Sequence, residues 1–190
     1  MDITDYLYNI NLSYDKTKLL EEMNNITFNP FNDLGPQQRG HWEAAGQRMM
    51  QRISKIPKGH WFDNPPTWLQ GHVVDTYPEI NKVQTQISNL LKCKDIRPRY
   101  YKQQINTPVP MHQDKGTLCA INILLSDTYG PIEFEDLGEI HYDCAILNLQ
   151  KKHAVPAFSK ERVLLKYSIF DVPYREALAN YRLNTTGDII

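Results

Sequence analysis

Cysteine, net charge and long apolar runs are all scarce in this chain of 190 residues. The three cysteines, Cys93, Cys119 and Cys144, are odd in number and far apart, and no C-x-x-C pair exists. The sequence therefore indicates neither a zinc knuckle nor a disulfide framework, and a reducing, cytoplasmic setting is the simplest expectation. A formal net charge of -1 gives no general attraction to nucleic acid or to an anionic membrane, so neither is expected as a partner.

Membrane and targeting signals are also missing from the sequence. No apolar run approaches the length that crosses a bilayer, and the acidic residues 1–5 do not read as a signal peptide. Hydrophobic residues make up 41% of the chain and charged residues 23%, which is ordinary for a folded protein. We expect one domain spanning residues 1–190, without internal repeats.

The N-terminal half, residues 1–96, has helical and irregular character. Apolar spacing predicts a short helix through residues 19–23 with Ser13 as a possible cap, and another helix over 41–53. A third helix is expected from about residue 76 to 91, with Asp75 or Thr76 as its cap and Pro78 in its first turn. Residues 29–40 and 57–66 read as loops. We expect this half to support a β-rich core.

From residue 97 to 171 the sequence pattern changes to short β-prone runs separated by turn residues. Because no helical pattern lies between these runs, βαβ units are excluded and a mainly β fold with flanking helices is expected, namely a jelly roll or double-stranded β-helix of the cupin-like kind. Residues 172–190 should form a final helix over 174–181 and a polar tail. The eight predicted strands are 100–105, 109–112, 118–125, 131–134, 139–142, 145–149, 153–158 and 163–170.

Three side chains in the β region suggest a metal centre. His112 and Asp114 form an H-x-D pair, and residues two apart in a strand project to the same side. His153 opens a later strand, and strands distant in sequence face one mouth of a jelly roll. Two imidazoles and a carboxylate can bind one face of an octahedral iron(II) and leave the other face open. Each residue also has an ordinary interpretation: a packed histidine beside a surface aspartate, and a strand-edge histidine.

Arg162 follows His153 by nine residues, at the start of the next predicted strand. Its planar guanidinium is suited to a bidentate interaction with a carboxylate. A surface charge in the sequence Ser-Lys-Glu-Arg is the alternative interpretation. The order H-x-D, distal histidine, then arginine, with each group at a strand boundary, favours an iron-dependent oxygenase that uses a 2-oxoacid.

These residues resemble the 2-oxoglutarate and iron(II)-dependent oxygenases, especially the aspartyl/asparaginyl β-hydroxylase-like and proline hydroxylase-like branch. The matching segments are 107–114, 138–142, 153–155 and 162–165, within residues 97–171. The resemblance implies that His112, Asp114 and His153 bind Fe(II). It further implies that Arg162 holds the distal carboxylate of the co-substrate 2-oxoglutarate, and that O2 occupies the remaining metal position.

The sequence departs from the pattern of this branch in several ways. The interval from His153 to Arg162 is one residue shorter than expected, which makes Lys166, on the same strand face, a rival anchor for 2-oxoglutarate. The stretch around Asn122 lacks the inward arginine and histidine of the branch, so Asn122 either faces the cofactor pocket or is a core amide. Because a carboxylate, Asp114, occupies the position where halogenases have glycine or alanine, the resemblance favours hydroxylation over chlorination.

Several further residues are less clearly assigned. Tyr101 and Gln103 either line the pocket or pack, and the tryptophans and histidines at 41, 42, 60, 61, 68 and 72 either form a substrate lid or fill gaps. The expected substrate is an amino acid, a small metabolite or a peptide side chain. The alternatives are a cupin-like metal-binding or sensor protein without oxygenase activity, and a metal-free scaffold. The oligomeric state is open.

Overall fold

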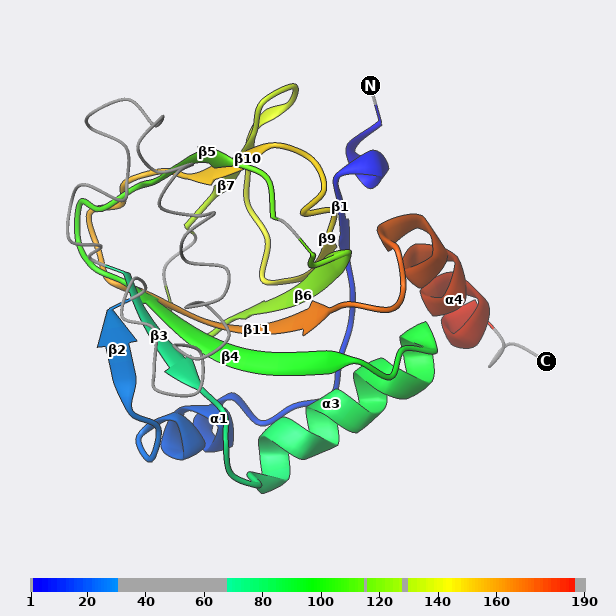
Figure 1. The fold of residues 1–190 in the computed structure, drawn as a ribbon, viewed down its shortest axis with the longest axis horizontal. Coiled ribbons are helices and arrows are strands. Elements are labelled where there is room, and N and C mark those ends of the chain that lie inside the picture. The colour runs from blue at the N-terminus through cyan, green and yellow to red at the C-terminus, as the bar shows by residue number, and fades with distance from the viewer. Residues whose placement is uncertain (1, 31–67, 115, 128–129, 187–190) are drawn as a thin grey trace, which may run out of the picture.

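The computed structural model describes residues 2–30, 68–114, 116–127 and 130–186 of the chain. Two antiparallel sheets dominate this part of the protein and face each other in Figure 1. From residue 96 onward the chain crosses repeatedly between the two sheets, which is the winding of a double-stranded β-helix. The expected jelly roll is therefore confirmed.

The major sheet contains seven strands within the described ranges. One edge of this sheet is the N-terminal strand β1 (Leu7–Asn9), which pairs with β9 (Cys144–Leu147) through Leu7 and Leu147. Every position of β6 is buried, which fits a strand covered on both faces. The strands in spatial order are β1 (Leu7–Asn9), β9 (Cys144–Leu147), β6 (Cys119–Leu124), β11 (Arg162–Ile169), β4 (Ile96–Gln103), β3 (Trp68–His72) and β2 (Phe28–Pro30).

The minor sheet is built from four short strands in the described part of the chain. At its edge, β5 and β10 place His112 directly opposite His153, and the pairing shifts between His153 and Val155. Phe134 of β7 lies on the other side of His153 in the same register. The order is β5 (Val109–His112), β10 (His153–Val155), β7 (Ile132–Phe134) and β8 (Gly138–Ile140).

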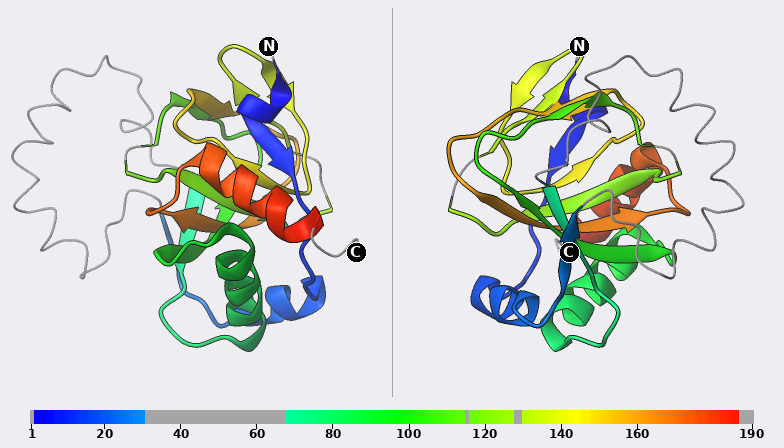
Figure 2. Two further views of the ribbon diagram at one scale, coloured as in Figure 1. Left: turned by 90° about the vertical axis from the view of Figure 1, so that its right-hand side faces the viewer. Right: turned by 60° about the vertical axis from the view of Figure 1, so that its left-hand side comes forward.

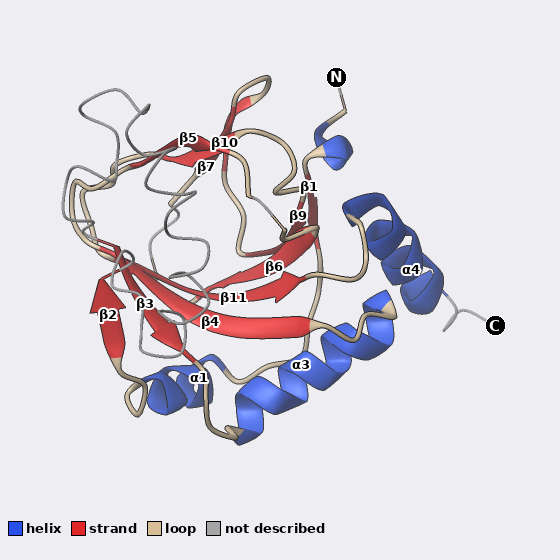
Figure 3. Ribbon diagram, viewed as in Figure 1, coloured by secondary structure: helices blue, strands red, loops and turns tan. Residues whose placement is uncertain are grey.

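Helices cover the outer face of the major sheet, which is turned away from the minor sheet (Figures 1 and 3). They are α1 (Lys16–Met23), α3 (Pro78–Leu91) and α4 (Tyr174–Thr186), and a short 3-10 helix, η1 (Ile3–Asp5), precedes β1. Two buried tyrosines connect the helices to the sheet: Tyr100 donates a hydrogen bond to the carbonyl of Leu19, and Tyr167 donates one to that of Ile80. The largest hydrophobic cluster fills this helix–sheet interface.

Strand alternation divides the major sheet into an outer and an inner face. On β11, Leu165 and Tyr167 join the outer cluster beneath the helices, whereas Leu164 belongs to a separate cluster with Tyr101 and Trp68. Arg162 and Lys166 share the face of Leu164, because they are two residues away from it in either direction. The inner face therefore contains two cations from one strand, and this face looks toward the minor sheet.

The N-terminal region contributes more to the sheet than its sequence suggested. β1, β2 and β3 all extend the major sheet, whereas residues 1–96 were expected to supply only helices and irregular segments. These strands have few residues, so their alternation was too brief to be detected. The expected helix at 41–53, and the tryptophans and histidines at 41, 42, 60 and 61, lie outside the described residues.

The expected cap of α3 was wrong. Tyr77 is the N-cap residue and makes no side-chain capping bond, so neither Asp75 nor Thr76 caps the helix. Pro78 occupies its first turn as predicted. Asp15 rather than Ser13 caps α1, accepting a hydrogen bond from the backbone of Lys18 at 3.2 Å. Among the described helices, none has the length and apolar character needed to cross a membrane.

Candidate metal centre and its surroundings

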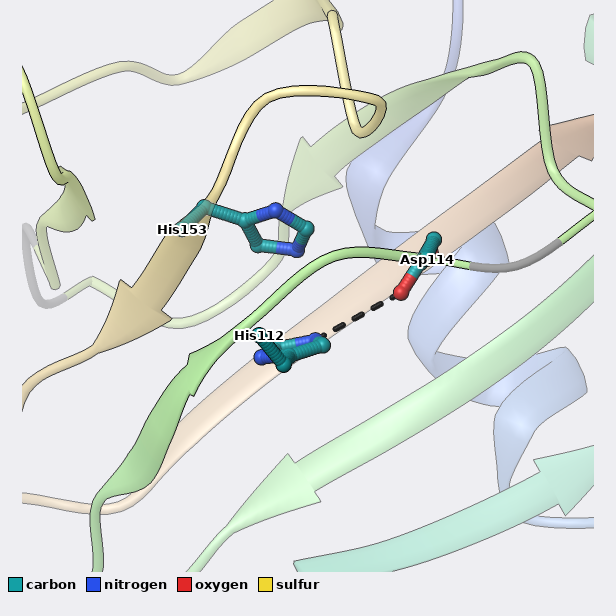
Figure 4. A group of neighbouring side chains, drawn as sticks. All are labelled: His112, Asp114 and His153. Carbon is teal, nitrogen blue, oxygen red and sulfur yellow. Dashed lines mark ion pairs between the residues drawn. The ribbon is translucent and has the colours of Figure 1, made fainter.

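The two facing ends of β5 and β10 bring His112, Asp114 and His153 together (Figure 4). Each residue offers one ligand atom, and these three atoms all lie within 4.8 Å of one another. Nε2 of His112 is 3.4 Å from Oδ1 of Asp114, and the two imidazole centroids are 4.3 Å apart. We call these three residues the His–Asp–His triad. Figure 2 shows the two sheets from two further directions.

Nδ1 of His153 is hydrogen-bonded to the backbone. Nδ1 lies 2.8 Å from the carbonyl oxygen of Lys151, and because that oxygen only accepts hydrogen bonds, Nδ1 must be the donor. Burial, followed by the nearness of His112, lowers the pKa of His153 to about 4. The ring is therefore neutral near pH 7, and its Nε2 has a lone pair for a metal. Hydrogen bonding of the other nitrogen is the usual way a protein orients a ligating histidine.

Asp114 interacts differently through its two oxygens. Oδ1 faces His112, whereas Oδ2 lies 2.9 Å from Nζ of Lys166. Burial alone would raise the pKa of Asp114, but the charge of Lys166 and hydrogen bonds from His112 and Lys166 keep that pKa below its usual range. Burial alone would lower the pKa of Lys166, and the Asp114 carboxylate raises it instead. The carboxylate is thus ionised, with one oxygen directed to the triad.

Arg162 lies deep between the sheets and is only 1% exposed, which excludes the interpretation as a surface charge. Nη1 donates to the carbonyl of Pro131 at 3.0 Å, and Nη2 donates to the hydroxyl of Tyr142 at 2.8 Å. Nε has no hydrogen-bond partner among the described residues. A buried guanidinium that has neither an anionic partner nor an acceptor for Nε–H in the described part of the chain is a suitable receptor for a carboxylate.

Tyr142 connects Arg162 with Asn122, and sequence reasoning did not assign it a role. Its hydroxyl oxygen accepts hydrogen bonds from Arg162 and, at 3.0 Å, from Nδ2 of Asn122. The proton of the hydroxyl remains available for an acceptor. Oδ1 of Asn122 is buried and unpaired within the described residues. Tyr142 lies in the segment between β8 and β9, and its sequence contains no signal that it folds back over the start of β11.

The remaining predicted pocket residues also lie on the inner face. Asn122 is directly opposite Lys166 in the pairing of β6 with β11. Tyr101 packs edge-on against Trp68, with ring centroids 6.4 Å apart, and it is 9% exposed. Gln103 uses its amide to bridge the carbonyls of Thr107 and Pro156, so it braces the turn before β5. Trp68 and His72 belong to β3 of the same sheet.

The donor set fits a divalent transition metal. Two imidazoles and one ionised carboxylate, with their ligand atoms within 4.8 Å of one another, are the kind of ligands that suit non-haem iron(II). The buried Arg162, with its unpaired Nε, fits the far carboxylate of a dicarboxylic co-substrate. The residues present therefore fit both groups.

Comparison with solved structures supports the fold. The viral collagen prolyl hydroxylase of Paramecium Bursaria Chlorella virus-1, in complex with 2-oxoglutarate, is 13% identical and has a TM-score of 0.55, over 90% of this chain and 99% of that chain. A prolyl-4-hydroxylase of Pseudomonas putida is 11% identical, with a TM-score of 0.43 over 82% of this chain and 98% of the other. An RmlC-like cupin protein of Desulfovibrio desulfuricans is 11% identical, with a TM-score of 0.37 over 60% and 92% of the two chains.

No family model and no curated protein sequence matches the chain. At such low identity the first of these structures establishes the shared fold and leaves the chemistry to be argued from this chain's own residues.

Proposed function

We propose that this protein is an iron(II)- and 2-oxoglutarate-dependent dioxygenase that hydroxylates an amino acid, a small metabolite or a peptide side chain. The observation that supports this most directly is the His–Asp–His triad, whose ligand atoms lie within 4.8 Å of one another at the junction of β5 and β10. The placement of a buried, uncompensated Arg162 between the same two sheets adds a receptor for a 2-oxoacid.

In this proposal His153 and Asp114 have defined tasks. His153 binds the metal through Nε2 while Lys151 fixes the ring through Nδ1. Asp114 would bind the metal through Oδ1, because Oδ2 is already paired with Lys166. When both are bound, iron(II) and 2-oxoglutarate supply the activation of O2, and the protein contributes position and exclusion of water.

The other end of the co-substrate would meet Arg162 and Tyr142. Nε–H of Arg162 and the hydroxyl proton of Tyr142 are donors without acceptors among the described residues, and both lie in a buried setting. A carboxylate placed there satisfies both, and a charge-assisted hydrogen bond in a buried site is strong. This assigns the anchor to Arg162 rather than to Lys166, whose ammonium already pairs with Asp114.

The product should be hydroxylated rather than chlorinated, since Asp114 occupies the metal position that a halide would need. We likewise propose a function close to the aspartyl/asparaginyl β-hydroxylase-like and proline hydroxylase-like branch, and a cytoplasmic location.

Two measurements test the function. Anaerobic addition of iron(II) and then 2-oxoglutarate should produce the weak visible charge-transfer band that arises only when the 2-oxoacid chelates the metal. Under air, a screen of amino acids and peptides should then identify a compound that stimulates formation of succinate. His112→Ala, Asp114→Ala and His153→Ala should each remove the band, because each lacks one of three ligands.

The matched control is His141→Ala, since His141 is an exposed histidine outside the triad. Iron binding without a charge-transfer band would instead favour the cupin-like metal-binding protein, and protein purified without chelators that contains no metal would favour a scaffold.

A further inference from the structure

The inner face of the major sheet contains a row of basic residues that begins at the triad. Lys166 of β11 lies opposite Arg99 of β4, and Arg99 lies opposite His72 of β3. Because strands in a sheet are about 4.8 Å apart, the row extends roughly 10 Å from Lys166 to His72. Arg99 lies two and four residues before Tyr101 and Gln103 on β4, so it is on the same face of the sheet as these inward-facing residues.

Among the described residues, Asp114 compensates the positive charge of Lys166, whereas none compensates that of Arg99. Lys166 pairs with Asp114 at 2.9 Å. Arg99 is half-buried, and none of the described residues forms an ion pair or hydrogen bond with it. Burial lowers the pKa of His72, and the charge of Arg99 lowers it further. Arg99 also acts against the rise that Asp114 causes in the pKa of Lys166. A permanently charged, partly desolvated guanidinium without a counter-ion is costly unless a ligand supplies the anion.

We propose that Arg99, with His72 beside it, binds a carboxylate group of the prime substrate, which would make that substrate a small carboxylic acid. That the bound acid is a substrate rests on the proposed function. The presence of an anion site at Arg99 does not. Arg99 is one strand beyond Lys166, and Lys166 contacts the metal-ligand candidate Asp114. The carboxylate would therefore lie on the side of the inner face where Lys166 reaches Asp114.

The place of Arg99 separates this site from the one proposed for 2-oxoglutarate. Arg162 lies four residues before Lys166 along β11, opposite Gln103, whereas Arg99 lies across from Lys166 itself. Two cations at different positions on the inner face would hold two different acids at once.

The test compares small acids with their own amides. The pairs are acetate and acetamide, N-acetylglycine and N-acetylglycinamide, and L-leucine and L-leucinamide. Saturation-transfer NMR measures their binding to the metal-free protein. A second experiment measures how far bound Mn(II) broadens their NMR lines in the presence of 2-oxoglutarate. We expect at least one acid to bind at millimolar concentration and to be broadened by Mn(II), while its amide binds far more weakly.

Variants assign the effect to Arg99. Arg99→Gln should weaken acid binding by about thirtyfold or more, as the loss of one partner from a desolvated charge pair does, and Arg99→Lys should restore part of it. Mn(II) and 2-oxoglutarate affinity should not change. Arg97→Gln is the matched control, because Arg97 is an arginine of the same strand that already pairs with Asp95 and stacks on Phe170.

Three outcomes would overturn the proposal: no acid in the panel binds better than its amide, Arg99→Gln binds the acids as well as the unmodified protein does, or Arg99→Gln weakens 2-oxoglutarate instead. Failure of the proposed function looks different. If saturation transfer shows acid binding that depends on Arg99, while neither Mn(II) nor 2-oxoglutarate binds, the anion site stands and the oxygenase is rejected.

Discussion

The two inward-facing cations of β11 differ in what they contact, and that difference assigns them different tasks. Arg162 donates to neutral oxygens of Pro131 and Tyr142, so no described residue compensates its charge, whereas Lys166 pairs with Asp114. A dicarboxylate would gain more from the uncompensated charge. Sequence spacing alone left both residues as candidate anchors, because both lie on the same face of one strand.

Substitution of these two residues should separate the roles. Arg162→Ala should weaken 2-oxoglutarate binding by about 2–5 kcal/mol, and Arg162→Lys should recover only part of that, because a single ammonium does not reproduce the guanidinium fork. Lys166→Met should leave 2-oxoglutarate affinity nearly unchanged. Calorimetric titration of the Mn(II) protein measures all three. A larger loss in Lys166→Met would make Lys166 the anchor.

Gly130 permits Arg162 to take its buried position. A Cβ atom at residue 130 would lie 2.6 Å from Cδ and 3.1 Å from Nε of Arg162. Gly130→Ala should therefore displace the guanidinium, cost about 1–3 kcal/mol of unfolding free energy and weaken 2-oxoglutarate binding. Urea denaturation and the same titration measure the two effects.

Gly116→Ala is the control for that substitution. Gly116 has a positive φ of 94°, yet a Cβ there would meet nothing within 4 Å. It should lose stability through backbone strain and keep its 2-oxoglutarate affinity. Equal affinity in Gly130→Ala and the unmodified protein would show that Arg162 can adapt.

At the scale of elements, helices α1 and α3 cap each other. Glu22 of α1 accepts hydrogen bonds from the backbone N–H groups of Glu79 and Ile80 at 2.7 and 3.0 Å, in the first turn of α3. Glu79 in turn accepts one from the backbone of Asp15 at 2.8 Å, at the start of α1. The Glu22 carboxylate thus replaces the local cap of α3 that was expected at residue 75 or 76. Its negative charge also interacts favourably with the positive N-terminal end of the α3 dipole.

Removal of this long-range cap should destabilise the protein. Glu22→Gln should lower the unfolding free energy by about 1 kcal/mol and Glu22→Ala by somewhat more, within the range known for N-caps. Thermal or urea unfolding measures it, with Glu21→Gln as the control, since Glu21 is an exposed neighbour on the same helix. Equal stability of the Glu21 and Glu22 variants would contradict the role of this contact.

At the scale of the whole molecule, all three cysteines are free and buried. Burial raises the pKa of Cys93 and of Cys144 to about 12, and it raises that of Cys119 as well. Cys93 and Cys119 lie between the major sheet and its helices, where a thiol behaves as a small apolar side chain. Thiolates, the reactive form, are therefore rare in the folded protein.

Labelling with a thiol reagent should accordingly report unfolding. We expect no rapid reaction of the native protein near pH 8 and reaction of all three thiols once denaturant unfolds it, measured by the absorbance of the released chromophore. Rapid labelling of one thiol in the native state would show that the helical layer opens locally.

The sequence by itself determined the β core. Predicted runs such as 109–112 and 163–170 coincide closely with β5 (Val109–His112) and β11 (Arg162–Ile169), because turn residues bound each run and apolar residues fill it. The same local signals identified α3 through its stripe of Ile80, Val83 and Ile87. The triad was predicted for a related reason: H-x-D is a local motif, and His153 opens a recognisable strand.

Only the tertiary structure decided the contacts between residues distant in the chain. The pairing of β5 with β10 places His153 opposite His112, the fold of residues 130–142 surrounds Arg162 with Pro131 and Tyr142, and sheet register sets Arg99 beside Lys166. None of these depends on local propensity. Each follows from how strands are paired and packed, which is fixed by burial of the whole inner and outer faces and not by any one segment.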